Sequence, residues 1–152
     1  MSLNIGDKIP DFSLVNYDKE SFNSEDFLGK KTMFVFMPFP FSSVCDGEIC
    51  ELRDNIDAFK SADTDTVMIT VAAGPTNRAW ANHYNIEFPI LADFWPHGEA
   101  SKQFGCFHDG VGISLRYTYI TNKENVITEI IKSDEIGVER DFEAYKEKFS
   151  IS

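Results

Sequence analysis

The chain has 152 residues, of which 43% are apolar, and a formal net charge of −11. This length and composition predict one globular domain, spanning residues 1–152, with a substantial core. The excess of acids argues against nucleic acid, whose phosphates are bound by Lys and Arg, and against an anionic membrane surface. The longest apolar run, residues 33–41, is far shorter than the roughly 20 residues of a membrane span. No membrane association is therefore expected.

Apolar periodicity and turn residues divide the chain into alternating strands and helices. Strands are predicted at residues 12–15, 33–37, 66–73, 88–91, 115–121 and 125–132. Helices are predicted at residues 42–59, 75–84, 99–104 and 138–149, with a helical turn inside 21–28 and a loop at 107–112. The last two strands should form a hairpin. This order predicts an α/β fold, a central mixed sheet flanked by helices.

The most informative stretch is the predicted strand at residues 33–37 and the helix after it. Pro38 and Pro40 end the strand, and Ser42 is a typical helix N-cap. Cys45 follows three residues later, where a capping box would carry Glu or Gln. A thiol among the unpaired N–H groups of a first helical turn is expected to lose its proton easily. The arrangement therefore favours a reactive thiolate, whereas the alternative is a small buried core cysteine.

Helical geometry also constrains the second cysteine of this segment. Cys45 falls on an apolar stripe and should therefore face the sheet. The other members of this stripe are Ile49, Leu52, Ile56 and Phe59. Cys50 lies about 140° round the helix from Cys45, with a Cα–Cα separation of about 8–9 Å. A disulfide needs less than about 7 Å. A bond between these two cysteines would therefore require the first turns of the helix to unwind.

The cysteine content bears on the compartment of the protein. The chain has three cysteines, an odd and low number. Such a count is typical of a cytosolic protein with reactive or transient thiols rather than of a disulfide-stapled secreted one. The N-terminus does not predict a secretory signal. A cytoplasmic protein is therefore expected.

The segment Pro38-x-x-x-Ser42-x-x-Cys45 resembles the P-x-x-x-[ST]-x-x-C active-site motif of the peroxiredoxins, thiol peroxidases with a thioredoxin-like fold. The resemblance extends over nearly the whole chain through features at Ile5–Leu14, Trp80, Phe88–Phe94 and Arg116. Residues 92–98, ADFWPHG, are most similar to the one-cysteine alkyl hydroperoxide reductase E-like branch. Cys50 instead resembles the resolving cysteine of the bacterioferritin comigratory protein branch, also called peroxiredoxin Q.

The resemblance implies a role for each residue of a catalytic group. Cys45 would attack a hydrogen peroxide or alkyl hydroperoxide and become a sulfenic acid. Ser42 would offer its hydroxyl to the peroxide or the thiolate, and Pro38 would screen the thiol from water; both could equally be a simple cap and a turn proline. Arg116 would stabilise the thiolate and the leaving oxygen, the alternative being a surface arginine at a strand start.

Two supporting residues are expected beside this group. Glu48 could hold Arg116 in a bidentate pair, or be a solvated helix acid. Trp80 is expected to pack near the site. No metal or other cofactor is expected, because the cysteines and histidines show no metal-binding spacing.

Recycling would follow one of two routes. Cys50 could attack the sulfenic acid to form a disulfide, or stay idle in a one-cysteine enzyme, and Cys106 is a less favoured resolving candidate. The reductant implied is thioredoxin or a related dithiol, and a homodimer through loops near the active site is also implied. A thiol–disulfide reductase is disfavoured because no C-x-x-C opens the helix, and a non-enzymatic redox sensor stays an alternative.

Overall fold

A computed structural model describes residues 2–151, so residues 1 and 152 of the expected domain lie outside the described residues. The strands of the main sheet are β1 (Ser13–Asn16), β2 (Ser21–Asn23), β3 (Lys31–Phe36), β4 (Thr64–Thr70), β5 (Ile90–Ala92), β8 (Arg116–Thr121) and β9 (Ile127–Ser133). The helices are the 3-10 helix η1 (Ser24–Phe27), α1 (Ser43–Asp54), α2 (Ile56–Ser61), α3 (Gly74–Tyr84), α4 (Glu99–Phe104) and α5 (Phe142–Phe149). A separate hairpin joins β6 (Phe107–His108) to β7 (Ile113–Ser114).

The main sheet has the order β2-β1-β5-β4-β3-β8-β9 and mixes parallel with antiparallel pairs. β3, β4 and β5 are parallel, and β8 runs antiparallel to β3 and to β9. Parallel neighbours require crossover connections. These are α1 with α2 between β3 and β4, and α3 between β4 and β5. The predicted mixed sheet and its closing hairpin are therefore confirmed.

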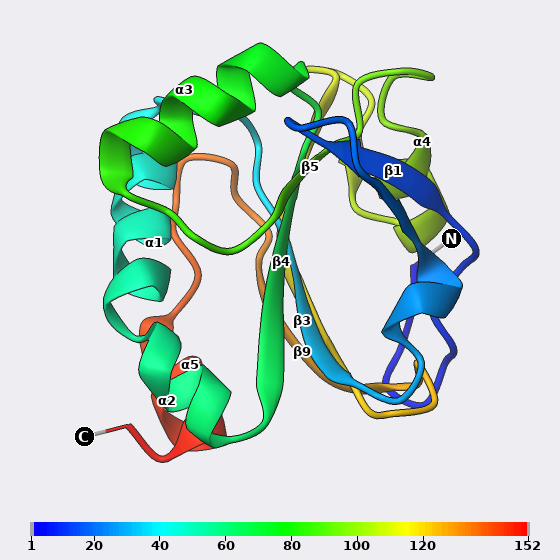
Figure 1. Ribbon diagram of the computed structural model, residues 1–152, viewed down its shortest axis with the longest axis vertical. Coiled ribbons are helices and arrows are strands. Elements are labelled where there is room, and N and C mark those ends of the chain that lie inside the picture. Colours follow the sequence, from blue (N-terminus) through cyan, green and yellow to red (C-terminus); the bar gives the residue numbers. More distant parts are fainter. Residues whose placement is uncertain (1, 152) are drawn as a thin grey trace.

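Alternation along β3 divides the core between the two faces of the sheet. Met33, Val35 and Met37 pack against α1, α2, α3 and α5, whereas Phe34 and Phe36 pack against α4 and the N-terminal strands. Figure 1 shows the first group of helices on one side of the sheet and α4 on the other. Since β3 is buried along most of its length, it delivers the chain from the protein interior directly to the start of α1.

The prediction of one continuous helix over residues 42–59 was wrong, because the structure has two helices there. The helix ends at Asp54, and a second one begins at Ile56. Between them Asn55 has non-helical angles of φ −113° and ψ 12°, and its side-chain amide donates to the carbonyl of Glu51 at 2.8 Å. Asn competes for backbone groups in this way and so favours helix ends. Phe59 is nevertheless buried as the stripe predicted, while Ile56 is only half-buried.

Other predicted boundaries also shifted. Residues 21–28 contain β2 before the helical turn, and the predicted loop at 107–112 contributes β6 to a two-stranded hairpin. The closing helix begins at Phe142 rather than at Val138, because the Asp141 side chain accepts from the backbone of Glu143 and caps it there. The chain before Asp141 is thus free to carry Arg140 into the interior. No helix within residues 2–151 has the length and apolarity to cross a membrane.

Candidate active site

The site is built at the N-terminus of α1, immediately after the buried strand β3. The Ser42 side chain accepts from the backbone N–H of Cys45 at 3.3 Å, so the predicted N-cap is confirmed. Phe41, just before the cap, has φ +68°, a left-handed conformation that is costly for a bulky residue. Such strain is typical of functional turns. Pro38 is buried in the same connection, and Cys45 is fully buried.

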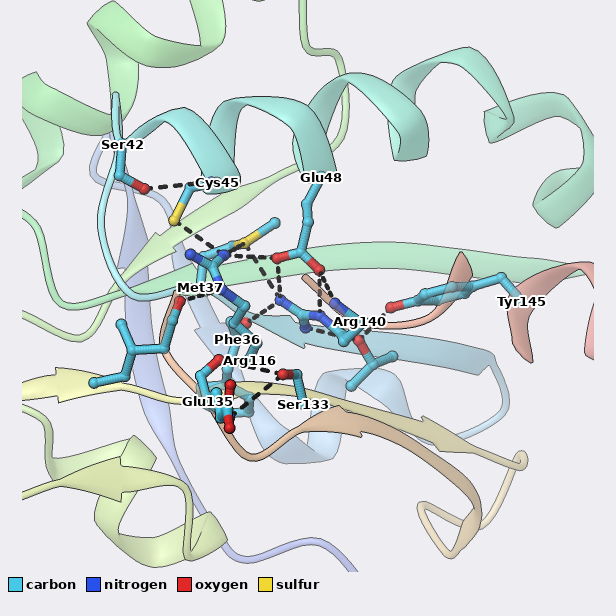
Figure 2. Close-up of polar contacts among 12 residues, drawn as sticks. Phe36, Met37, Ser42, Cys45, Glu48, Arg116, Ser133, Glu135, Arg140 and Tyr145 are labelled. Atoms are coloured by element: carbon cyan, nitrogen blue, oxygen red, sulfur yellow. Dashed lines mark hydrogen bonds and ion pairs between the residues drawn. The ribbon is translucent and has the colours of Figure 1, made fainter. Parts of the chain in front are cut away.

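Arg116 lies directly against the sulfur of Cys45. Its Nη1 is 3.2 Å from Sγ, although 71 residues separate the two in the chain. The side chain is only 2% exposed, so the interpretation as a surface arginine was wrong. Its Nε donates to the carbonyl of Ile136 at 2.7 Å, which fixes the plane of the guanidinium. Figure 2 shows this cation beneath the first turn of α1, so a negative charge on the sulfur would be stabilised there.

Glu48 is buried and shared between two arginines. Its Oε1 accepts from Nη1 of Arg116 at 2.7 Å, while Oε2 accepts from Nε of Arg140 at 2.9 Å. The bidentate partner is therefore Arg140, whose Nη2 also reaches Oε1 at 3.2 Å, and not Arg116 as predicted. The alternative of a solvated acid is wrong as well, because Glu48 is 8% exposed.

The charge of Glu48 is set by this pairing. Burial acts to raise the pKa of Glu48, but the charge and hydrogen bonds of Arg140, together with the hydrogen bond from Arg116, outweigh it and leave the pKa below its usual value. The carboxylate is thus ionised at neutral pH. It lies between the two guanidinium groups (Figure 2) and holds Arg116 beside the sulfur of Cys45.

Arg140 was missed by the sequence reasoning. Besides Glu48, it binds the carbonyl of Phe36 at 2.8 Å, the hydroxyl of Thr118 at 3.0 Å and the sulfur of Met37 at 3.3 Å. It therefore ties the end of β3 to β8 beneath α1. No spacing signal marks it, because it stands in a polar segment between two acids that is typical of a protein surface.

Trp80 of α3 lies near the site, as expected. Its ring is fully buried, and its Nε1 donates to Oδ1 of Asp46 at 2.8 Å. Asp46 directly follows Cys45, so this bond joins the first turn of α1 to α3. Within residues 2–151, no cluster of three or more His, Cys, Asp or Glu is arranged to hold a metal ion.

Residues 5–130 match the AhpC/TSA family. The chain belongs to that family. It is 35% identical over 126 residues to alkyl hydroperoxide reductase E of Mycobacterium tuberculosis, covering 82% of each chain, and 30% identical over 129 residues to peroxiredoxin-4 of Bos taurus, covering 80% of this chain and 46% of the other. It is accordingly an oxidoreductase of the peroxiredoxin type.

Solved structures of this family confirm the predicted thioredoxin-like fold. The Enterococcus faecalis AhpC structure superposes with a TM-score of 0.85 at 25% identity, covering 99% of this chain and 92% of that one. Peroxidoxin BcpB of Mycobacterium tuberculosis gives a TM-score of 0.81 at 21% identity, covering 95% and 92%. Both solved structures thus share the architecture of this chain over nearly its whole length.

The other two cysteines of this peroxiredoxin, Cys50 and Cys106, differ in burial and in their position relative to the sheet. All three are free thiols, and Cys50 is half-buried within the intact helix α1. Burial raises the pKa of the Cys50 thiol; Arg53 opposes this, while Asp54 and Asp46 add to it. Cys106 is fully buried in the cluster on the opposite face of the sheet from Cys45. The sheet separates it from the site, which removes Cys106 as a resolving candidate.

Proposed function

We propose that this enzyme reduces hydrogen peroxide and alkyl hydroperoxides through a thiolate at Cys45. The sulfur attacks the terminal oxygen, the O–O bond breaks, and the leaving oxygen takes up a proton to become water or an alcohol. Cys45 is left as a sulfenic acid. The observation that carries the proposal is the contact of Arg116 Nη1 with Sγ at 3.2 Å at a helix N-terminus.

The neighbouring residues would each serve this step. Arg116 stabilises the thiolate and the charge developing on the leaving oxygen. Ser42 presents a hydroxyl within the same turn, and the buried ring of Pro38 limits water at the thiol. Glu48 holds Arg116 in place, and Trp80 packs the first turn of α1 against α3. None of these steps requires a metal or an organic cofactor.

Recycling is proposed to proceed through Cys50. Its thiol attacks the Cys45 sulfenic acid, an S–S bond forms, and the oxygen leaves as water. Because the two cysteines stand on one intact helix, α1 must first unwind at its start. Thioredoxin or a related dithiol would then reduce the disulfide. If Cys50 stays idle, the enzyme is a one-cysteine peroxiredoxin and an external thiol attacks the sulfenic acid.

The protein is further proposed to be cytoplasmic and to form a homodimer. Free thiols fit the reducing cytoplasm, and residues 1–152 are taken as one domain. Two aromatic side chains on the loop before α1, Phe39 and Phe41, are 41% and 47% exposed. A second copy of the chain would bury them, which supports a homodimer formed near the active site.

Replacing Cys45 by serine should abolish peroxide consumption by the purified protein, since an alcohol neither ionises nor is oxidised under these conditions. The loss of peroxide, followed with a dithiol reductant present, measures this. The matched control is Cys106→Ser, which should keep activity. Full activity in Cys45→Ser would refute the proposal. Insulin reduction without peroxide would instead indicate a thiol–disulfide reductase, and a single slow turnover without recycling would indicate a redox sensor.

The pH dependence of disulfide formation should follow the thiol of Cys50. Because burial raises the pKa of this thiol, little thiolate is present at neutral pH. The rate should therefore rise about tenfold per pH unit from pH 7 and keep rising beyond the ordinary thiol value of about 8.5. Quenched mass spectrometry after one equivalent of peroxide detects the loss of about two hydrogen atoms. A rate that is level above pH 7 would contradict this assignment.

A further inference from the structure

One face of α3 contacts α1 and its leading loop on both sides of Cys45. On the C-terminal side, Trp80 Nε1 donates to Asp46 Oδ1 at 2.8 Å. On the N-terminal side, the ring of Phe41 packs edge-on against His83, with 6.0 Å between ring centroids. Trp80 and His83 are three residues apart and therefore share a helix face. The residues flanking the reactive cysteine are thus both fixed to a single neighbouring helix.

The Asp46–Trp80 bond is the stronger of these two attachments. The acceptor is a carboxylate, and hydrogen bonds to charged acceptors are about twice as strong as neutral ones. The indole is fully buried in the core cluster that contains Cys45 and Ile49, so it cannot follow a moving loop. The Tyr84 side chain stands close to the same carboxylate, which contributes to raising the pKa of Tyr84. Asp46 is therefore held by a rigid partner.

We propose that Asp46 is a positioning residue that holds Cys45 beside Arg116 by bonding Trp80, and that this bond must break before Cys45 can reach Cys50. The proposal rests on the proposed peroxidase function and on recycling through Cys50. It assigns to one carboxylate the balance between the two steps: an intact bond favours attack on peroxide, and a broken bond favours disulfide formation.

The geometry of α1 makes the two steps exclusive. In the helix, the Cα atoms of Cys45 and Cys50 are about 8–9 Å apart, beyond the reach of about 7 Å that a disulfide allows. Unwinding the first turn is required to shorten this distance. Asp46 is the next residue along, so its carboxylate leaves the indole when that turn opens. The disulfide then forms from the Cys45 sulfenic acid and the Cys50 thiol with release of one water.

Replacement of Asp46 by alanine should therefore change the two rates in opposite directions. We expect the reaction with hydrogen peroxide to slow several-fold and disulfide formation to speed up about tenfold, the usual order for losing one hydrogen bond to a charged group. Asp46→Asn should shift both rates in the same directions but by less than Asp46→Ala, because its amide oxygen can still accept from the indole although it is neutral. Stopped-flow oxidation and quenched mass spectrometry measure the two rates separately.

The effect of the Asp46 charge on the pKa of Cys50 must be distinguished from the effect of the Asp46–Trp80 hydrogen bond. Asp54, in the last turn of the same helix, also raises the pKa of Cys50 but pairs with Arg53 away from Trp80. Asp54→Ala is therefore the matched control, and it should leave the peroxide rate unchanged. Trp80→Phe breaks the same bond from its other end and keeps an aromatic ring. It should reproduce Asp46→Ala, and the double variant should add no further effect.

Tryptophan emission gives a readout that does not depend on any Asp46 variant. The chain has two tryptophans, and Trp95 is 83% exposed, so Trp95→Phe isolates the buried Trp80. The Trp80 emission should shift when the disulfide forms and not when the sulfenic acid forms. Equal rates in wild type and Asp46→Ala, or no Cys45–Cys50 disulfide in either, would overturn the proposal. Absence of peroxide consumption in wild type would instead refute the proposed function itself.

Discussion

Replacing Arg116 by methionine is expected to slow the reaction of Cys45 with hydrogen peroxide by about 10²- to 10³-fold, the usual cost of removing one donor that faces developing charge. The guanidinium is 2% exposed and stands 3.2 Å from the sulfur. Methionine keeps an unbranched apolar stem in place of the arginine stem, while the guanidinium and its positive charge are lost. The second-order rate constant of the first turnover, measured by rapid mixing, isolates this step from recycling.

Two further variants separate the catalytic loss from a general loss of structure. Arg116→Lys keeps a cation but loses the planar fork that reaches both Glu48 and the sulfur, so an intermediate rate is expected. Arg78→Met removes a half-exposed arginine that pairs with Asp18 at 3.1 Å on the surface, and it should react like wild type. If Arg116→Met instead reacted within about twofold of the wild-type rate, Arg116 would not be the group that stabilises the thiolate and the leaving oxygen.

The parts of the site that the sequence revealed are those encoded locally. Ser42 and Cys45 lie within one helical turn, and the N-cap geometry follows from their spacing alone. Arg116 was located only through resemblance, since its contact with Cys45 bridges 71 residues. The expected pairing of Glu48 with Arg116 is present, but its bidentate partner, Arg140, was missed for the same reason, since it is 92 residues away. A strand, a helix and a returning loop must meet before these charges become neighbours.

The fold shows the same dependence on local chemistry. Helix α4 was predicted at its observed bounds, Glu99–Phe104, because Gly105 directly after it adopts a left-handed conformation and closes it. Asn55, by contrast, interrupts the helix although the apolar pattern of the sequence continues through Phe59. The break depends on one hydrogen bond from the Asn55 side chain to a carbonyl, and apolar periodicity does not indicate such a bond. The late start of α5 escaped prediction because its cap, Asp141, lies inside an otherwise continuous amphipathic pattern.

Replacing Glu48 by glutamine should lower the free energy of unfolding at pH 7 by about 3–5 kcal/mol, the cost of removing one partner from a buried ion pair. Glu48 forms salt bridges with both Arg116 and Arg140, whose side chains are 2% and 1% exposed. Glutamine keeps the shape, but its amide is neutral and turns a donor toward one of the cations. For a chain of this size we expect a fall in Tm of about 10 °C, measured by calorimetry. The matched control is Glu51→Gln, an exposed acid on the same helix, which should change stability by about 0.5 kcal/mol or less.

The pH dependence of the stability difference between wild type and Glu48→Gln tests whether that difference is electrostatic in origin. Burial raises the pKa of Glu48, but Arg140 and then Arg116 outweigh burial and lower the pKa below its usual value. A carboxyl with a lowered folded pKa stabilises the native state above its unfolded pKa, about 4.3, and the stabilisation is lost as pH falls through the folded value. The gap between wild type and Glu48→Gln should therefore stay constant from pH 8 to about pH 5 and shrink at more acidic pH. A gap that instead widened below pH 4 would mean that the two guanidinium groups do not hold Glu48 in its ionised form.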